Sequence, residues 1–137
     1  MSRPSAARRG DLFAAECPSR QVLQHVTSRW GVLVLVALRS GERRRFSELR
    51  REIGGVSEKM LAQTLQGLEG DGFVERTAHP VVPPHVDYRL TRLGRQVAGH
   101  VHELADWIEA SMPAIERART QRAAADTAAD TAADTAA

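Results

Sequence analysis

The fold is decided by residues 46–72, which read FSELRREIGGVSEKMLAQTLQGLEGDG. The first half predicts a short amphipathic helix, because apolar residues recur at i, i+3 and i+7: Phe46, Leu49 and Ile53. Gly54-Gly55 predicts a tight turn. Ser57 then supplies the N-cap of a second helix, whose apolar stripe consists of Leu61, Leu65 and Leu68. The stretch therefore predicts two short helices joined by a tight turn.

Two further helices are expected before this pair. Pro18 suits the first turn of a helix that runs to about Val26, because its missing N–H would have no helical partner there. Thr27 and Ser28 offer an N-cap for the next helix, from Arg29 to Arg39. We expect this helix to be the central, buried one, because large apolar side chains surround it: Trp30, Leu33, Val34, Val36, Ala37 and Leu38.

A hairpin and a long helix are expected after the pair. Two short strands, Phe73 to His79 and His85 to Leu90, are separated by a proline-rich loop in which strand pairing cannot continue. Thr91 caps a helix from about Arg92 to Arg122. Its apolar stripe follows steps of three and four residues: Val97, Val101, Leu104, Ile108, Met112 and Ile115. Pro113 lies inside this helix and predicts a kink or an end there.

Length and composition are typical of one small domain. The chain has 137 residues, of which 42% are hydrophobic, and we place the domain at residues 11–122. Residues 1–10 form a basic arm that we expect to be flexible, and residues 123–137 form a low-complexity Ala/Asp/Thr tail that we expect to be disordered. No apolar run approaches the roughly 20 residues of a membrane helix, and no secretory segment is evident. We therefore expect a cytoplasmic, nucleoid-associated protein without a membrane partner.

The order of these elements predicts a winged helix-turn-helix: a mainly α fold with a small β-hairpin (α+β) and a long C-terminal dimerisation helix. In this fold the second helix of the pair lies in the major groove of double-stranded DNA, and the hairpin reaches a neighbouring groove or the backbone. A helical wheel centred on the leucine stripe places Lys59, Gln63 and Gln66 opposite it, flanked by Met60 and Gly67. Glutamine can bond adenine, lysine can reach guanine or a phosphate, and methionine can contact a thymine methyl.

Ordered motifs from Cys17 to Trp107 resemble the HxlR-type family of bacterial winged-helix regulators. The motifs are Cys17-Pro18, Trp30-Gly-Val-Leu-Val-Leu, Arg44-Arg-Phe-Ser-Glu-Leu, Val56-Ser-Glu-Lys-Met-Leu, Leu65-Gln-Gly-Leu-Glu, Gly72-Phe-Val-Glu-Arg, Val82-Pro-Pro-His-Val-Asp-Tyr-Arg-Leu-Thr and Leu93-Gly. The resemblance implies a dimeric transcription factor, with DNA contact from Ser57, Lys59, Met60 and Gln63. It also implies backbone contact from the region of Arg43 to Ser47 and from the hairpin.

Basic residues outside the recognition helix are candidates for phosphate contact, which supplies affinity without sequence information. The candidates are Arg43, Arg44, Arg45, Ser47, Arg76, His85 and Arg89. The chain departs from the family pattern at Glu58, where proline is common, and at His85, where arginine or lysine is common. Protonation of His85 at lower pH is expected to raise the affinity of the hairpin for DNA.

The long C-terminal helix predicts a homodimer, because its apolar stripe is longer than the small domain can cover. The expected interface residues are Val97, Val101, Leu104, Ile108 and Met112. Two recognition helices about 34 Å apart would then recognise an inverted repeat. The alternative is that the stripe folds back on its own domain.

Cys17, the single cysteine, has two interpretations. It can be a small, partly buried residue before a helix. It can also be a reactive thiol, because a helix N-terminus and Arg20 one turn further on favour the thiolate. The resemblance supports the second interpretation, since some HxlR-type regulators sense oxidants or electrophiles at this Cys-Pro position. Reversible oxidation would then form an intersubunit disulfide, a mixed disulfide or an adduct.

Enzymatic function is not expected, because the sequence has no Gly-rich phosphate loop, nucleophile elbow or paired carboxylates in an apolar setting. The five histidines are scattered along the sequence, and His102 with Asp106 at i, i+4 supplies too few ligands for a metal site. We therefore expect no cofactor and no metal. The alternatives to a sequence-specific repressor are a winged-helix module that binds another protein, as an antirepressor does, and a non-specific architectural DNA binder. Any small-molecule effector is unknown.

Overall fold

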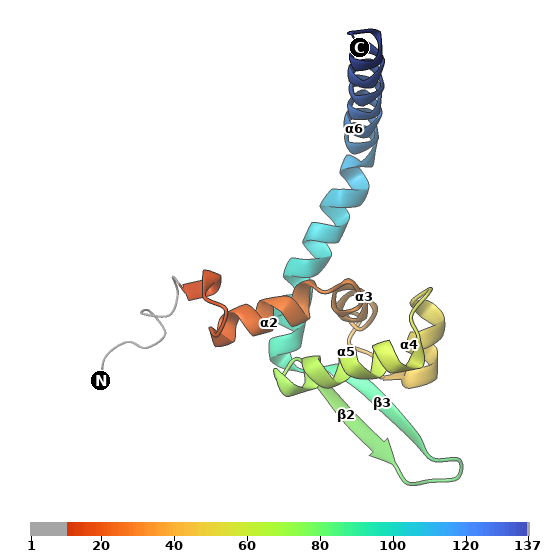
Figure 1. Ribbon diagram of the computed structural model, residues 1–137. Coiled ribbons are helices and arrows are strands. Elements are labelled where there is room, and N and C mark those ends of the chain that lie inside the picture. The colour runs from red at the N-terminus through yellow and green to blue at the C-terminus, as the bar shows by residue number, and fades with distance from the viewer. Residues whose placement is uncertain (1–10, 137) are drawn as a thin grey trace. The chain divides into compact units, whose positions relative to one another are not determined.

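A computed structural model describes residues 11–136 of the chain (Figure 1). The elements, in order, are the 3-10 helix η1 (Asp11–Phe13), α2 (Pro18–Thr27), α3 (Arg29–Ala37), β1 (Arg44–Arg45), α4 (Phe46–Glu52), α5 (Glu58–Gly70), β2 (Val74–His79), β3 (His85–Leu90) and α6 (Arg92–Ala136). This mainly helical fold with a small antiparallel sheet confirms the predicted fold class. None of the helices described is both long enough and apolar enough to cross a membrane. The predicted arm at residues 1–10 lies outside the described residues.

The chain consists of two compact units, with the boundary between His102 and Glu103. The first unit holds all the strands and the helices up to the first part of α6, and it contains the hydrophobic core. The second unit consists of the rest of α6. We describe each unit separately.

Hydroxyl side chains begin three of the helices, as the sequence predicts. Ser28 Oγ accepts a hydrogen bond from the backbone N–H of Gly31 (3.0 Å), and Ser57 Oγ accepts one from Met60 (3.1 Å). Thr91 Oγ1 accepts one from Gly94 (3.0 Å). Each bond satisfies an N–H that has no partner within its helix, so the local sequence fixes where these helices begin.

The core lies where α3, α4 and α5 pack together. Eight large side chains are less than 2% exposed: Leu35, Leu38, Leu49, Leu61, Leu65, Leu68, Leu90 and Val34. Three of them belong to α3 or directly follow it, which confirms that this helix is the central one. Leu33 is 41% exposed, however, so one side of α3 is open in the monomer.

The sheet has three strands rather than the expected two. Its order is β1-β3-β2, and β1 pairs with β3 through Arg44 opposite Tyr88 and Arg45 opposite Asp87. Two arginines carry no strand preference of their own, and only the pairing with β3 makes them a strand. The first strand of the hairpin begins at Val74 instead of Phe73, whose side chain is buried in the core.

The C-terminal helix is longer than predicted. It continues past Arg122 to Ala136, and Pro113 lies inside it without ending it. The expectation of a disordered tail is therefore corrected to a helical one, because alanine has the highest helix propensity. All side chains of residues 123–135 are exposed, so no side chain of this segment of α6 is buried within the described chain.

Candidate nucleic-acid interface

The two faces of α5 differ sharply in burial, as the helical wheel predicts. On the inner face, Leu61 and Leu68 are 0% exposed and Leu65 is 1% exposed. On the outer face, Lys59, Gln63 and Gln66 are all exposed. Met60 beside them is 41% exposed, and Ser57 lies exposed at the N-cap. The buried leucines orient the helix, so its outer face presents donors, acceptors and one flexible apolar side chain to solvent.

Helix α2 borders the outer face of α5 on one side. A hollow of about 220 Å³ is lined by Gln24, His25, Ser28, Met60, Gln63, Thr64 and Gly67. His25 Nδ1 lies 2.6 Å from Asp71 Oδ2, which joins α2 to the residue that follows α5. A Cβ at Gly67 would lie 3.5 Å from the His25 ring, so the two helices approach closely here. No local sequence pattern indicates this contact, because the two residues are 46 positions apart.

The hairpin borders α5 on the other side. A hollow of about 430 Å³ is lined by Ala62, Gln66 and Glu69 of α5, together with Arg76 and Tyr88 of the hairpin. Arg76, a predicted backbone contact, is exposed and lies beside α5. Gln66 was on the predicted outer face but was not among the predicted base-reading residues. Gln66 and Arg76 line the same hollow because the hairpin packs beside α5.

The predicted run of Arg43, Arg44 and Arg45 does not form one patch. Arg44 bonds the Glu52 carboxylate of α4, and this hydrogen bond raises the pKa of the guanidinium. Arg43 donates to Thr77 Oγ1 (3.0 Å) and lies 4.0 Å from Glu75 Oε1. The side chain of Arg45 is exposed. Neighbours on a strand point to opposite faces, which separates Arg44 from the other two.

The remaining predicted backbone contacts lie in two places. Ser47 lines a hollow of about 420 Å³ between α4 and the N-terminus of α5, with Phe46, Arg50, Arg51, Val56 and Glu58. Arg50 there lies 3.4 Å from Glu58, so the carboxylate that departs from the family pattern has a cation beside it. On the hairpin, Arg89 Nε lies 3.1 Å from Glu75 Oε1. His85 is part of a side-chain cluster near the tip.

The predicted dimer residues fall into two groups. Val101 is 7% exposed and belongs to the core of the first unit, and Val97 packs against that core. These two therefore pack in their own domain, which is the alternative that the sequence left open. Leu104 is 55% exposed and Ile108 is 42% exposed. Trp107, which lies between them, is 63% exposed, and Met112 is half-buried. This second group is an exposed apolar stripe on α6.

Cys17 is the N-cap residue of α2 and is 6% exposed. Its Sγ lies 2.9 Å from Ser19 Oγ. Arg20, which was expected to favour the thiolate, donates instead to the carbonyl of Phe13 (2.8 Å). Cys17 therefore lies at the start of a helix, as predicted, but Arg20 bonds the Phe13 carbonyl.

The model of the HxlR-like helix-turn-helix family matches residues 25–116. This chain belongs to that family. Over 117 residues the HxlR-like chain is 66% identical to YtfH, an uncharacterized HTH-type transcriptional regulator of Escherichia coli K12. The match covers 85% of this chain and 92% of YtfH.

Solved structures give the same result. The structure of ytfH from Salmonella typhimurium is 66% identical and superposes with a TM-score of 0.75, covering 79% of this chain and 96% of that one. The redox regulator HypR in its reduced form is 31% identical, with a TM-score of 0.65, covering 72% of this chain and 97% of HypR. The HxlR-like chain is thus a helix-turn-helix transcriptional regulator and not an enzyme.

Proposed function

We propose that the protein is a homodimeric, sequence-specific repressor that binds an inverted-repeat operator. The observation that carries this proposal is α5, whose leucine face is fully buried while its polar face is exposed between two hollows. A helix held in this way by its own core can enter the major groove without rearrangement.

Lys59, Met60 and Gln63 read base edges in this proposal, and Ser57 contacts the backbone or a base at the start of the helix. Arg45 and Arg76 are exposed and contact phosphates on the hairpin side. Arg43, Arg44 and Arg89 hold intramolecular partners, so their contribution to DNA affinity is smaller.

The dimer in this proposal forms through the exposed stripe of α6. Burial of a large apolar side chain contributes about 1.5–3 kcal/mol, and Leu104, Trp107 and Ile108 expose much of theirs. Their spacing puts them on one face of the helix, which suits pairing with the same stripe of a second copy.

A redox response through Cys17 is a second candidate function. Its support is the similarity to HypR, described as a redox regulator, together with the place of Cys17 at the start of α2. Because the thiol is 6% exposed, oxidation requires the Cys17 region to open before a disulfide or adduct forms. This opening would couple the thiol to the arrangement of the dimer.

Selection from a pool of random duplexes tests both functions, first with reduced protein and then after mild oxidation. Enrichment of an inverted repeat supports the repressor model. Loss of that enrichment on oxidation, restored in Cys17→Ser, supports the redox function. Enrichment of no motif would contradict the operator model. Retained low-salt binding to every duplex would then indicate an architectural protein, and no binding at all would indicate a protein-interaction module.

Two variants separate base reading from backbone contact. Gln63→Ala is expected to lose about 1–3 kcal/mol at one base pair and to relax the preference there, whereas Arg76→Ala weakens all sequences alike and reduces the salt slope by about 1. Gln96→Ala, an exposed glutamine of α6, serves as the matched control and leaves binding unchanged. If Gln63→Ala weakened the binding of all DNA sequences equally, the assignment of Gln63 as a base-reading residue would be contradicted.

A further inference from the structure

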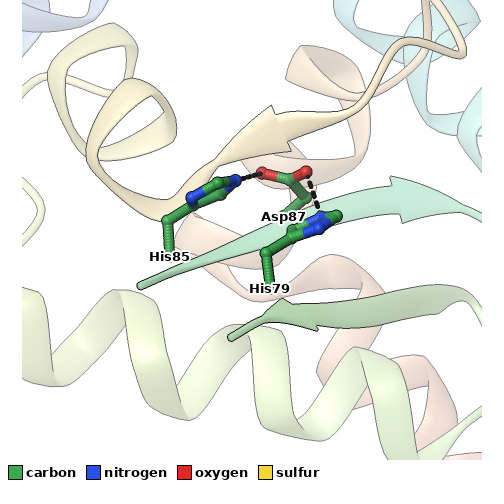
Figure 2. A group of neighbouring side chains, drawn as sticks. All are labelled: His79, His85 and Asp87. Carbon is green, nitrogen blue, oxygen red and sulfur yellow. Dashed lines mark ion pairs between the residues drawn. The ribbon is translucent and has the colours of Figure 1, made fainter. Parts of the chain in front are cut away.

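Three side chains with metal-binding chemistry meet near the tip of the hairpin: His79, His85 and Asp87 (Figure 2). His79 of β2 and His85 of β3 are direct cross-strand partners. Asp87 follows His85 by two residues, so it lies on the same face of the hairpin. The hairpin register thus brings together three groups that are separate in the sequence.

The distances in the cluster are close to those of ligands around one ion. His79 Nε2 lies 2.8 Å from Asp87 Oδ2, and His85 Nε2 lies 3.9 Å from Asp87 Oδ1. One ligand atom of each residue lies within 4.8 Å of the other two. Around a tetrahedral ion with bonds of about 2.0–2.1 Å, ligand atoms are about 3.3 Å apart. Small side-chain rotations would therefore bring all three onto one centre.

Hydrogen bonding leaves the imidazole nitrogens available. His79 Nε2 is buried and makes no hydrogen bond of good geometry, although the Asp87 carboxylate is near. The Nδ1 of His85 lies 3.5 Å from the carbonyl of Pro83. When Nδ1–H donates to this carbonyl, Nε2 carries the lone pair toward Asp87, as in metal-binding histidines whose second nitrogen is held by a carbonyl.

We propose that His79, His85 and Asp87 form a binding site for a divalent transition-metal ion such as Zn²⁺. Two imidazoles and a carboxylate are the borderline donors that Zn²⁺ accepts, and three protein ligands leave the fourth position to water or to an external ligand. The side chains are 35%, 24% and 14% exposed, in chain order, so an ion can enter.

The two imidazole rings are stacked, with centroids 4.6 Å apart and planes inclined by 24°. Imidazole binds a metal ion through a lone pair in the plane of the ring, so one ring must turn about its side chain for both to bind the same ion. Arg45 is the cross-strand neighbour of Asp87 on β1, and its exposed side chain can remain turned to solvent. Binding would join β2 to β3 beside the proline-rich loop.

Titration of the untagged, chelator-treated full chain with Zn²⁺, without DNA, tests this site. Calorimetry is expected to show one ion per chain, with affinity that falls as the pH is lowered and the histidines bind protons. His85→Ala and Asp87→Asn are each expected to lower the affinity at least about tenfold. Co²⁺ substitution should give the visible absorption of a tetrahedral site in the wild type and not in these variants.

Two controls make the result specific. His100→Ala removes an exposed histidine of α6, and Cys17→Ser removes the thiol; both are expected to bind Zn²⁺ as the wild type does. Circular dichroism verifies that the hairpin variants are folded. Unchanged affinity in His85→Ala and Asp87→Asn, or loss of binding in Cys17→Ser, would overturn the proposal. Because the readout contains no DNA, this result is independent of the operator model.

Discussion

The two parts of α6 share one helix and one apolar period but differ in what they contact. In the first part, up to His102, Ala98 is 0% exposed and Val101 is 7% exposed within the core. In the second part, from Glu103, Leu104 and Trp107 are 55% and 63% exposed. The core therefore buries Ala98 and Val101 of the first part, whereas Leu104 and Trp107 of the second part are exposed.

This difference shows that an apolar stripe identifies a surface to be buried but not its partner. Exposed clusters of large apolar side chains on a soluble domain mark interaction surfaces. The experiments below test the two parts against each other, in order of decreasing effect.

The largest effect is expected from Leu104→Ser combined with Ile108→Ser. If this stripe holds the dimer, the loss of two apolar side chains raises the dimer dissociation constant at least about a hundredfold, or about 2.7 kcal/mol. Analytical ultracentrifugation measures it. Glu103→Ser with Ala110→Ser, two exposed positions of α6 outside the stripe, is the matched control and should remain dimeric. A wild-type dimer that survives the first pair of substitutions would place its interface elsewhere.

Alanine substitutions at two glycines in the first part of α6 are expected to change the free energy of unfolding in opposite directions. A Cβ at Gly94 would lie 1.9 Å from the carbonyl oxygen of Phe73, so Gly94→Ala forces the backbone apart and lowers the free energy of unfolding by about 1–3 kcal/mol. A Cβ at Gly99 would meet nothing within 4 Å, so Gly99→Ala stabilises the helix by about 0.5–1 kcal/mol. Urea denaturation measures the free energy of unfolding of both variants. Equal changes in the two variants would show that Gly94 does not pack closely against Phe73.

Removal of residues 123–137 is expected to leave the domain intact. The side chains of residues 123–135 are exposed, so the free energy of unfolding should change by less than about 0.5 kcal/mol. Helical ellipticity at 222 nm should nevertheless fall, because these residues continue α6. An unchanged total ellipticity would restore the disordered tail that the low-complexity sequence suggests.

Small effects are also expected at the ion pairs of the two units. Arg44 is paired with Glu52 at a partly buried position, so Arg44→Gln lowers the free energy of unfolding by about 0.5 kcal/mol. Arg122 forms an exposed i, i+4 pair with Asp126, so Arg122→Gln leaves the free energy of unfolding measurably unchanged. The pKa of Arg44 is raised, so its stabilisation is present below the unfolded pKa and is lost only as pH rises through the folded one. The effect of Arg44→Gln should therefore be constant between about pH 6 and 9, since both values lie well above this range.

The helices and the polar face of α5 could be predicted from the sequence because local signals specify them. Ser28, Ser57 and Thr91 cap their helices through bonds that span three residues. The leucine spacing of α5 determines which face is buried, whatever the partner helices are. These features depend on neighbours in sequence, so one sequence is enough to predict them.

The strand β1 and the contacts of the basic residues could not be predicted in the same way. Arg44 and Arg45 become a strand only because β3 lies beside them. The partners of Arg43 are 34 and 32 residues away on β2, and no local pattern points to them. The sequence therefore did not show which of these arginines have partners within the chain.

The sequence by itself determined the winged helix-turn-helix, the polar face of α5 and the family, because caps, turns and apolar periods act over a few residues. Only the tertiary structure decided which half of the α6 stripe is core and which is exposed, and that His79, His85 and Asp87 meet. The physical reason is the same in both cases. Burial and cross-strand register depend on segments that are distant in sequence, and packing brings them together only when the chain is folded.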